Sequence, residues 1–321
     1  MPNATQLWPW RRSPGSSAPR EGSRRKITRM ALLLGVLLVL ASLAVGCGSG
    51  SASSAKTLDI ADIGWTENSA VSALTGVLLE DQLGYQQVTT HTEDLDSAYH
   101  SVAQGELNAF EDVWLPNQQD KLYGVKDDVE VLGPWYRGQT EQGIAVPSYM
   151  DITSLDQLNE SQVDLILGIE PSSVIMDKVH DDVIPAYGLK QELVEAPTAG
   201  MLDEVEKLYR DREEFAFIAW SPHWMNKQYD IRYLQDPKNA FGELNDPVQV
   251  MTVVNKDLGD RDPEAYAFMK AMTLAEGQLD DLESMIDKEG DPRKGARAWA
   301  EKNQEVWQPW VEAARNAQEK T

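Results

Sequence analysis

Three tryptophans stand where predicted strands end, and this placement suggests a binding site. They are Trp65, Trp114 and Trp220, two in the first half of the chain and one in the second. Ligands of open parallel sheets bind beside such strand ends. An indole face attracts a cation that donates no hydrogen bonds, such as a quaternary ammonium, by about 2 kcal/mol when desolvated. Three such faces give roughly 6 kcal/mol, below the ~8 kcal/mol of micromolar affinity, so a second anchor is needed.

Residues 168–176, which read GIEPSSVIM, offer that second anchor. The pattern predicts a strand ending at Ile169 and a serine-capped helix, which leaves the backbone N–H groups of Val174 and Ile175 unpaired. Such a helix start binds carboxylates and phosphates. Taken alone, the segment is equally compatible with an ordinary strand-to-helix turn. Across a cleft from an aromatic cage, it predicts a small zwitterion with a quaternary nitrogen and a carboxylate.

Motifs of catalysis and metal binding are missing from the sequence. It has no GxSxG nucleophile elbow, no HExxH and no GxxxxGK(S/T) phosphate loop. His223 is the best general-base candidate, but no nucleophile is evident beside it, and we interpret it as a packing or hinge residue. The single Cys excludes a thiolate-rich zinc site. We therefore expect no enzyme activity, no metal and no cofactor.

Length and charge narrow the function classes further. The 321 residues, 42% of them hydrophobic, are enough for two domains with cores. A net charge of -23, from 29 Lys+Arg against 52 Asp+Glu, argues against a nucleic-acid partner, because that affinity comes largely from basic side chains. We expect a monomer that binds a small molecule.

Alternating apolar runs and helical periodicity predict an α/β protein with two lobes. The first series has strands near 58–63, 86–90 and 107–114, and the second has strands near 164–169, 191–194 and 215–220, with a helix between successive strands of each series. Repeated strand–helix units imply parallel sheets covered by helices.

The chain is expected to cross between these lobes twice. Residues 143–146 lead out of the first lobe before Pro147, and residues 248–254 read as a strand that returns to the first sheet. We thus predict that lobe 1 comprises residues 56–146 and 248–321, and lobe 2 residues 147–247. The hinge is then expected near Val146 and Pro247.

The N-terminal region reads as an export signal. Basic residues at positions 24–29 precede an apolar run from 31 to 45, which is too short for a membrane span of about 20 residues. The triplet before Cys47 resembles a bacterial lipobox, although Ala44 replaces the commoner Leu. We expect a signal peptide at 1–46, a lipidated Cys47 within a Gly/Ser linker at 47–55, and an extracytoplasmic protein anchored to the cell membrane by its lipid.

Five segments give the chain a specific resemblance to one family. They read DIGWTENSA from Asp62, FEDVWLPNQ from Phe110, GPWYRG from Gly133, GIEPSSVIM from Gly168 and AWSPHW from Ala219. In this order they resemble the substrate-binding lipoproteins of glycine betaine/proline betaine ABC transporters. The resemblance implies a bilobal periplasmic-binding-protein fold of type II, in which two lobes with parallel or mixed sheets close on the ligand about a hinge.

The resemblance also implies roles for particular residues. Trp65, Trp114 and Trp220 would form the cage, and the amides of Val174 and Ile175 would bind the carboxylate, although many members have Gly at position 174. A further donor, a His in some members, is Gln119 here, which can donate a hydrogen bond but cannot become charged. Glu67 stands where choline-binding relatives carry an acid that bonds the alcohol; the helix dipole alone would also favour an acid there.

The expected function is capture of glycine betaine or proline betaine, as osmoprotectants, for delivery to an ABC permease. The alternative ligand is choline or another methylated amine. An acid that reaches the cleft would favour choline, whereas a dominant carboxylate site at the helix start would favour betaine. A structural or sensor lipoprotein that delivers no cargo would have lost the cage residues, and this sequence keeps all three.

Overall fold

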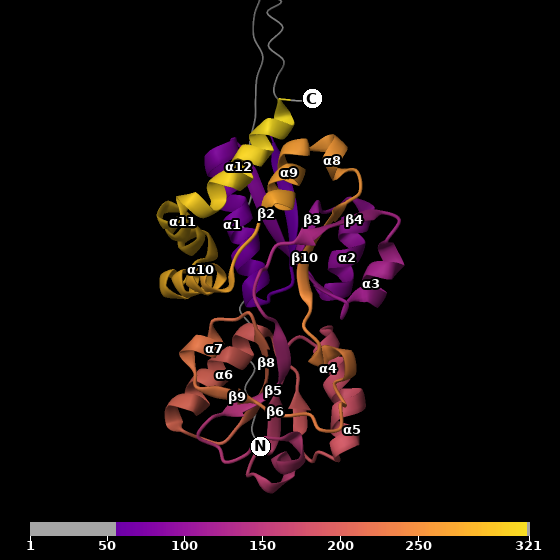
Figure 1. The fold of residues 1–321 in the computed structure, drawn as a ribbon, viewed down its shortest axis with the longest axis vertical. Coiled ribbons are helices and arrows are strands. Elements are labelled where there is room, and N and C mark those ends of the chain that lie inside the picture. Colours follow the sequence, from indigo (N-terminus) through magenta and orange to yellow (C-terminus); the bar gives the residue numbers. More distant parts are fainter. Residues whose placement is uncertain (1–55, 320–321) are drawn as a thin grey trace, which may run out of the picture. The chain divides into compact units, whose positions relative to one another are not determined.

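The computed structural model describes residues 56–319, which belong to one compact unit built on two five-stranded sheets. Figure 1 shows one sheet in the upper part of the view and the other in the lower part, each covered by helices. The expected signal peptide, Cys47 and the Gly/Ser linker lie outside the described residues. Within residues 56–319, no helix combines the length and apolar character needed to cross a membrane.

The first sheet has the order β2-β1-β3-β10-β4. Its strands are β1 (Thr57–Asp62), β2 (Gln87–Thr92), β3 (Ala109–Leu115), β4 (Val129–Pro134) and β10 (Gln249–Asn255). Strand β1 pairs in parallel with β2 and β3, while β10 runs antiparallel to both β3 and β4. The late strand expected near 248–254 therefore lies in the first sheet.

The second sheet repeats this pattern with the order β7-β6-β8-β5-β9. Its strands are β5 (Glu141–Pro147), β6 (Leu165–Leu167), β7 (Glu192–Val194), β8 (Ala216–Ser221) and β9 (Ile231–Tyr233). Strand β6 pairs in parallel with β7 and β8, and β5 is antiparallel to β8 and β9. The sheets are mixed because β5 and β10, the strands that the chain enters from the other sheet, each run against their neighbours. The expected bilobal α/β architecture is confirmed.

The first crossing between the sheets differs from the expectation. Strand β5 pairs with β8 from Glu141 onward, so the chain leaves the first lobe at residues 135–140 and not at Val146. The apolar run at 143–146 is a central strand of the second sheet. The two crossings are joined by Thr140, whose Oγ1 accepts from the Val248 amide at 2.8 Å and donates to the Val248 carbonyl at 3.2 Å.

Helices cover both sheets. Those of the first lobe are α1 (Thr66–Leu83), α2 (Leu95–Gln104), α3 (Gln119–Val125), α8 (Leu258–Arg261), α9 (Pro263–Ala271), α10 (Glu276–Glu289), α11 (Pro292–Lys302) and α12 (Gln304–Gln318). Those of the second are η1 (Leu155–Glu160), α4 (Val174–Lys178), η2 (Val179–Val183), α5 (Ile184–Tyr187), α6 (Thr198–Asp211), α7 (Met225–Gln228) and η3 (Gly242–Asn245). The C-terminal helices pack on the first lobe, as Figure 1 shows.

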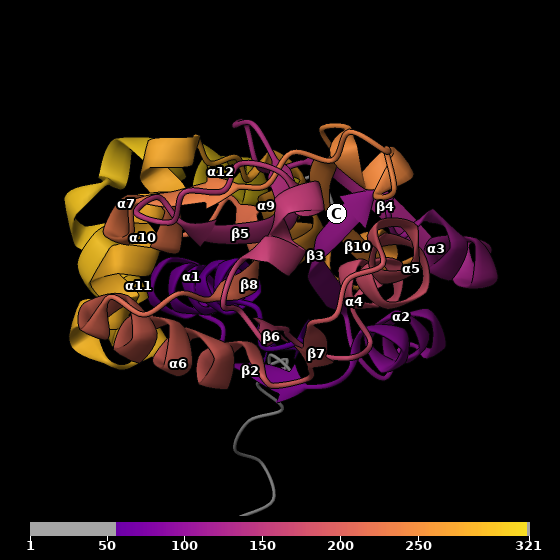
Figure 2. The same cartoon turned by 90° about the horizontal axis from the view of Figure 1, so that it is seen from below.

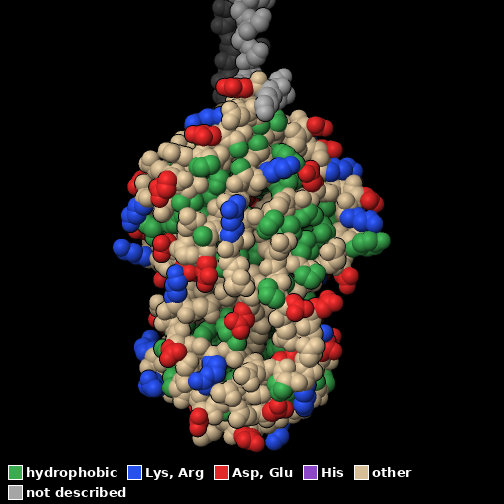
Figure 3. Space-filling view, viewed as in Figure 1, with side chains coloured by type: hydrophobic (Ala, Val, Ile, Leu, Met, Phe, Trp, Pro, Cys, Tyr) green, Lys and Arg blue, Asp and Glu red, His purple; other side chains and the backbone are tan. Residues whose placement is uncertain are grey.

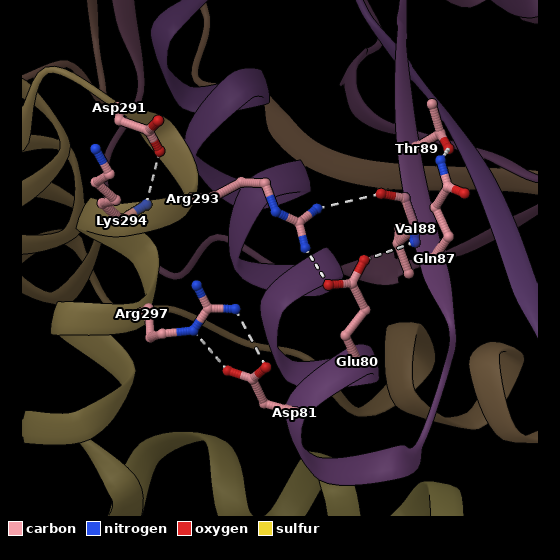
Figure 4. A network of polar contacts seen from close by, with 9 residues as sticks. All are labelled: Glu80, Asp81, Gln87, Val88, Thr89, Asp291, Arg293, Lys294 and Arg297. Atoms are coloured by element: carbon pink, nitrogen blue, oxygen red, sulfur yellow. Dashed lines mark hydrogen bonds and ion pairs between the residues drawn. The ribbon is translucent and has the colours of Figure 1, made fainter.

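Helix α1 is the central helix of the first lobe and is buried along most of its length. It ends at Gly84, whose φ of 73° is the left-handed conformation that glycine adopts without strain. Helix α11 is held against it by two ion pairs, Arg293 with Glu80 and Arg297 with Asp81 (Figure 4). Arg293 also donates to the Val88 carbonyl of β2, so the same side chain ties helix α11 to both α1 and the sheet edge.

The helix that begins after Ser173 runs on through three segments. Helix α4, the π-helical turn η2 and helix α5 follow one another without a break from Val174 to Tyr187. Pro185 lacks an amide hydrogen, and a wider turn just before it accommodates the missing hydrogen bond and the proline ring. The start of this helix therefore carries the dipole of a longer helical run than α4 alone.

Candidate ligand-binding site

A small cavity lies where residues of the two sheets and their following loops meet. Its lining residues are Trp65, Glu67, Trp114, Asn117, Gln118, Gln142, Ser173, Val174, Ile175, Ile218 and Trp220. Six of the seven ligand-contact residues expected from the sequence are thus brought together in one place. Gln119 is the exception: it is exposed and does not line the cavity.

The three tryptophans reach the cavity from three different elements. Trp65 follows β1 and precedes α1, Trp114 lies near the end of β3, and Trp220 lies near the end of β8. All three are buried, with exposed fractions of 5–8%. Strands β3 and β8 each stand third in the strand order of their sheet. Trp114 and Trp220, near the ends of these strands, therefore occupy matching positions in the two lobes. A cation between the lobes would meet ring surfaces from both.

Each of these indoles donates its ring N–H to a carboxylate. Trp220 Nε1 donates to Glu67 Oε2 at 3.0 Å, and Trp114 Nε1 donates to Asp112 Oδ1 at 2.9 Å. Trp65 Nε1 donates to Glu170 Oε2 at 3.2 Å. Because each N–H group at a ring edge is hydrogen-bonded to a carboxylate, the ring orientations are fixed. The indoles then have only their π surfaces left for a ligand. Such a lining suits a methylated cation, which neither donates nor accepts hydrogen bonds.

Two of these bonds connect the lobes. Trp220 belongs to the second lobe and Glu67 to the first, while Trp65 belongs to the first and Glu170 to the loop before α4 in the second. Glu170 is held by Thr198, whose amide and hydroxyl both donate to its carboxylate at 2.8 and 2.7 Å. The Trp65 and Trp220 rings are therefore oriented by contacts that exist only while the lobes are together.

Glu67 is the acid that reaches the cavity. Its side chain is fully buried, Oε2 accepts from Trp220, and Oε1 has no hydrogen-bond partner among the described residues. Burial, which disfavours the charged form, raises the pKa of Glu67 to about 8, and the nearby charge of Glu170 adds to the rise. Glu67 does stand in the first turn of α1, as the dipole argument allows, but it also faces the ligand space.

Further buried acids lie behind Glu67. Burial raises the pKa of Asp112 well above its ordinary value, and the charge of Glu67 adds to this effect. The pKa of Glu283, on α10, is raised well above its ordinary value for the same two reasons. Burial therefore favours the neutral forms of these three acids in the ligand-free protein.

The residues of the expected carboxylate anchor also belong to the cavity lining. The amides of Val174 and Ile175 have no acceptor among the described residues, and both residues line the cavity. The Ser173 hydroxyl does not cap the helix, because it donates to the Glu170 carbonyl at 2.9 Å. Two residues of the lining therefore carry unpaired N–H groups at the positive end of a helix, and such helix starts bind carboxylates.

Two further side chains that line the cavity, those of Asn117 and Gln118, precede Gln119 in the sequence. Gln118 is buried, and its Oε1 accepts from the Tyr99 hydroxyl at 2.8 Å, which leaves its NH₂ group as a donor. Both polar atoms of the Asn117 side chain are buried without a partner among the described residues. Both residues lie at the end of the FEDVWLPNQ segment, directly before Gln119.

His223 has a packing role between the lobes. It is 1% exposed, and its Nε2 lies 2.8 Å from the Thr66 hydroxyl of α1. Its Nδ1 accepts from the Met225 amide at 3.1 Å, so Nε2 carries the hydrogen and donates to Thr66. Burial lowers the pKa of His223 to about 3, so the ring is neutral near pH 7.

Comparisons with known proteins agree with this geometry. Among curated proteins, the chain is 26% identical over 150 residues to the glycine betaine/carnitine transport binding protein GbuC of Listeria monocytogenes serotype 1/2a (strain 10403S). The match covers 46% of this chain and 49% of that protein, so the chain spans about half the length of the curated relative it matches.

Solved structures share the fold over most of the chain. Lactococcal OpuAC, in its closed conformation complexed with glycine betaine, has a TM-score of 0.71 and 26% identity, covering 80% of this chain and 99% of that one. The glycine betaine/L-proline-binding protein ProX of Borrelia burgdorferi has a TM-score of 0.71 and 25% identity, covering 81% and 99%. An ABC-transporter choline binding protein in complex with choline, at 22% identity and a TM-score of 0.70 over 82% and 98% of the chains, shares the fold.

The family match extends over both lobes. Residues 56–302 match OpuAC, described as the substrate binding domain of ABC-type glycine betaine transport systems. These residues contain all the strands of both sheets and every residue that lines the cavity. The chain therefore belongs to the family of substrate-binding domains of ABC-type glycine betaine transport systems, and its fold is the bilobal periplasmic-binding-protein fold of type II.

Proposed function

We propose that this protein is the extracytoplasmic receptor of an ABC importer, which captures glycine betaine or a related quaternary-ammonium osmoprotectant and delivers it to a permease. In this role Trp65, Trp114 and Trp220 hold the methylated nitrogen, and the amides of Val174 and Ile175 bind the carboxylate. The protein itself carries out no chemical step.

The observation that carries this proposal is the lining of the cavity. Three indole rings have their N–H groups committed to Glu67, Asp112 and Glu170, and the same cavity exposes two unpaired backbone amides. A quaternary ammonium needs ring surfaces without competing hydrogen-bond donors, whereas a carboxylate needs donors and no nearby negative charge. Each half of a betaine thus has a matching part of the cavity.

The amide groups near the cage extend the carboxylate site. Gln118 keeps a free NH₂ group and Asn117 has a free side-chain amide, and both line the same cavity as Val174. We propose them, in place of Gln119, as the additional donors to the ligand carboxylate. Neither can become charged, so the site would bind a carboxylate without a formal ion pair.

Choline is the second candidate ligand, and one observation favours it. The Glu67 Oε1 atom is buried in the cavity lining without a partner among the described residues, so it could accept a hydrogen bond from an alcohol. A betaine has no such donor. We rank choline second because the amides of Val174 and Ile175 would then remain unpaired.

Calorimetric titration of residues 56–321 with glycine betaine, proline betaine, choline and carnitine tests the proposal. Micromolar binding of the betaines with weaker choline binding is expected. Binding of choline alone would transfer the main role to Glu67 and make this a choline receptor. No heat from any of the four would contradict a quaternary-ammonium receptor of either kind.

Delivery to a permease implies an equilibrium between open and closed lobes. We propose lobe 1 as residues 56–140 and 248–321 and lobe 2 as residues 141–247, with bending at the two crossings that Thr140 joins to Val248. Ligand would shift this equilibrium toward the closed form that a permease recognises. Small-angle scattering should show a smaller radius of gyration with glycine betaine than without; equal radii would contradict ligand-driven closure.

We further propose a lipid anchor at Cys47 and a monomeric receptor. The export signal and the residues before Cys47 support the anchor, while the interspersed acidic and basic side chains on the face in Figure 3 suit a solvated surface. Mass spectrometry of the membrane-extracted protein should find an N-terminal diacylglyceryl-cysteine, which a Cys47→Ala variant lacks. Light scattering of residues 56–321 should give the mass of one chain.

A further inference from the structure

Glu67 is the only ionisable side chain among the residues that line the cavity. The other lining residues are aromatic, aliphatic, amide-bearing or hydroxyl-bearing, and none is basic. The charge of the cavity wall itself is therefore either zero or minus one, depending on one proton. No Lys or Arg stands in the lining to neutralise that charge once Glu67 ionises.

The surroundings of Glu67 are also acidic. The charge of Glu170, in the loop before α4, raises the pKa of Glu67. The charge of Glu67 in turn raises the pKa values of Asp112 on β3 and Glu283 on α10. The charge of Asp62, at the end of β1, also raises the pKa of Asp112. On the second-lobe side, His223 is neutral near pH 7, and Lys227 of α7 pairs with Asp280 at 2.5 Å and not with Glu67.

Hydrogen bonding leaves one carboxyl oxygen of Glu67 open. Oε2 accepts from Trp220, so it must keep a lone pair toward that indole in either protonation state. Oε1 has no partner among the described residues, and it is the oxygen that can carry a proton into the ligand-free cavity. A cation placed against the Trp220 ring would thus come close to the atom that bears the proton.

We propose that Glu67 releases its proton when a net cation enters the cage and keeps it when a zwitterion enters, so that the pH of the medium sets the choice between choline and betaine. This inference rests on the proposed function, because it assumes that quaternary ammonium compounds bind at the cage.

The proton balance distinguishes the two ligand classes. When choline binds, the Oε1–H bond of Glu67 breaks, the proton passes to a buffer base, and the carboxylate left behind neutralises the buried positive charge. When glycine betaine binds, its own carboxylate, held at Val174 and Ile175, already neutralises its ammonium group. A second negative charge in the cavity would then be opposed, and Glu67 stays protonated.

The direction of the pH effect follows from the pKa of about 8 that burial gives the ligand-free Glu67. Below that pH choline must displace a proton, so its affinity rises about tenfold for each unit of increasing pH. Above that pH the acid is already ionised and choline affinity levels off. Betaine affinity should change by less than about threefold between pH 6 and 8, because its binding displaces little or no proton.

Calorimetric titrations at pH 7 in buffers of different ionisation enthalpy measure the released proton directly on the unaltered protein. We expect close to one proton released per choline bound and less than half a proton per glycine betaine. Equal proton release for the two ligands, or none for choline, would overturn the inference while leaving the proposed function intact. Failure of both ligands to bind at any pH would instead contradict the proposed function.

Two variants assign the proton to its residue. Glu67→Gln should abolish proton release and remove the pH dependence of choline affinity between pH 6 and 8. Glu111→Gln is the matched control: Glu111 is equally buried on β3, and its pKa is raised to about 7, but it does not line the cavity. Its proton release should remain that of the unaltered protein. Undiminished proton release in Glu67→Gln would overturn the assignment.

Discussion

The indole of Trp220 in the second lobe donates its N–H to the Glu67 carboxylate in the first lobe at 3.0 Å. One hydrogen bond therefore orients a wall of the ligand cage, occupies an oxygen of the only acid in the lining, and joins the two lobes. Ring position, local charge and closure depend on the same pair of side chains. Changes at either residue are expected to alter all three.

Trp220→Ala should weaken glycine betaine binding at least tenfold, because a desolvated cation–π contact contributes about 2 kcal/mol. Trp220→Phe keeps an aromatic surface but loses the bond to Glu67, and its loss should be smaller. Trp307→Phe is the control, since Trp307 is buried on α12 and donates to the Ala300 carbonyl. It should lower the melting temperature without changing affinity. Unchanged affinity in Trp220→Ala would contradict the cage.

Val174→Pro removes one proposed carboxylate donor without removing the helix. Val174 is the first residue of α4, where proline is well tolerated, and Ser173 before it is already extended at φ -74° and ψ 139°. Loss of one hydrogen bond to a charged group, about 1.5–3 kcal/mol, should weaken glycine betaine binding by roughly 10- to 150-fold. Choline has no carboxylate, and calorimetry should find its affinity nearly unchanged. An equal loss for both ligands would indicate damage to the cavity and not to the carboxylate site.

A contact away from the cavity also joins the lobes. Lys227 of α7 pairs with Asp280 of α10, and these helices lie side by side in Figures 1 and 2. Lys227 is largely exposed, so the pair is screened and should favour closure by no more than about 1 kcal/mol. Lys227→Met combined with Asp280→Asn should weaken ligand binding by roughly two- to fivefold, and high salt should weaken the unaltered protein similarly.

The control for this pair is Lys207 with Glu204, which lies within the single helix α6. Lys207→Met combined with Glu204→Gln removes a surface pair of the same chemistry that connects nothing between the lobes. Its affinity for glycine betaine, measured by calorimetry, should stay at the unaltered value. If both double variants bind as tightly as the unaltered protein, the α7–α10 pair has no part in closure.

The ligand-free protein should lose stability as the pH rises from about 4.5 to 7, because of its buried acids. For Glu111 the folded-state pKa of about 7 lies above the ordinary 4.5, so the folded state binds more protons than the unfolded state in this window. Its contribution is full below 4.5 and is lost as the pH approaches 7. Between pH 5 and 7.5 this amounts to about 2 kcal/mol.

Urea denaturation of the ligand-free protein at pH 5 and pH 7.5 checks that contribution. Glu111→Gln cannot ionise, and it keeps an acceptor for the Thr75 hydroxyl, which lies 2.9 Å from Glu111 Oε1. The difference in unfolding free energy between the two pH values should shrink by about 2 kcal/mol in this variant. Glu204→Gln on the exposed face of α6 should leave the difference unchanged. A stability that rises over this pH range would contradict the raised pKa.

The sequence indicates which residues come together in the proposed cage and carboxylate anchor, because both depend on local patterns. Trp65, Trp114 and Trp220 follow apolar runs, and parallel strands present their carboxyl ends to one edge. The unpaired amides of Val174 and Ile175 belong to a helix start that the sequence predicts, although the Ser173 hydroxyl donates to the Glu170 carbonyl and does not cap the helix as expected. Contacts across the lobes were not accessible in the same way: Glu170 is 105 residues from Trp65, and nothing in the spacing indicates that they meet.

The two positional differences have local causes. Gln118 is the last residue of the turn before α3 and Gln119 is the first residue of that helix, so a difference of one position decides which side chain lines the cavity. The apolar run at 143–146 has the composition of a strand in either sheet. Its antiparallel pairing with β8 and β9 places it in the second one, and that pairing depends on residues more than 70 positions away.

The most direct test of the central claim compares glycine betaine with glycine, which differ only in the three methyl groups on nitrogen. Calorimetry with residues 56–321 should give micromolar affinity for glycine betaine and no measurable binding of glycine, because the ammonium hydrogens of glycine would find no acceptors on the indole surfaces. Equal affinity for the two, or binding of glycine alone, would contradict a cage whose function is to hold a quaternary nitrogen.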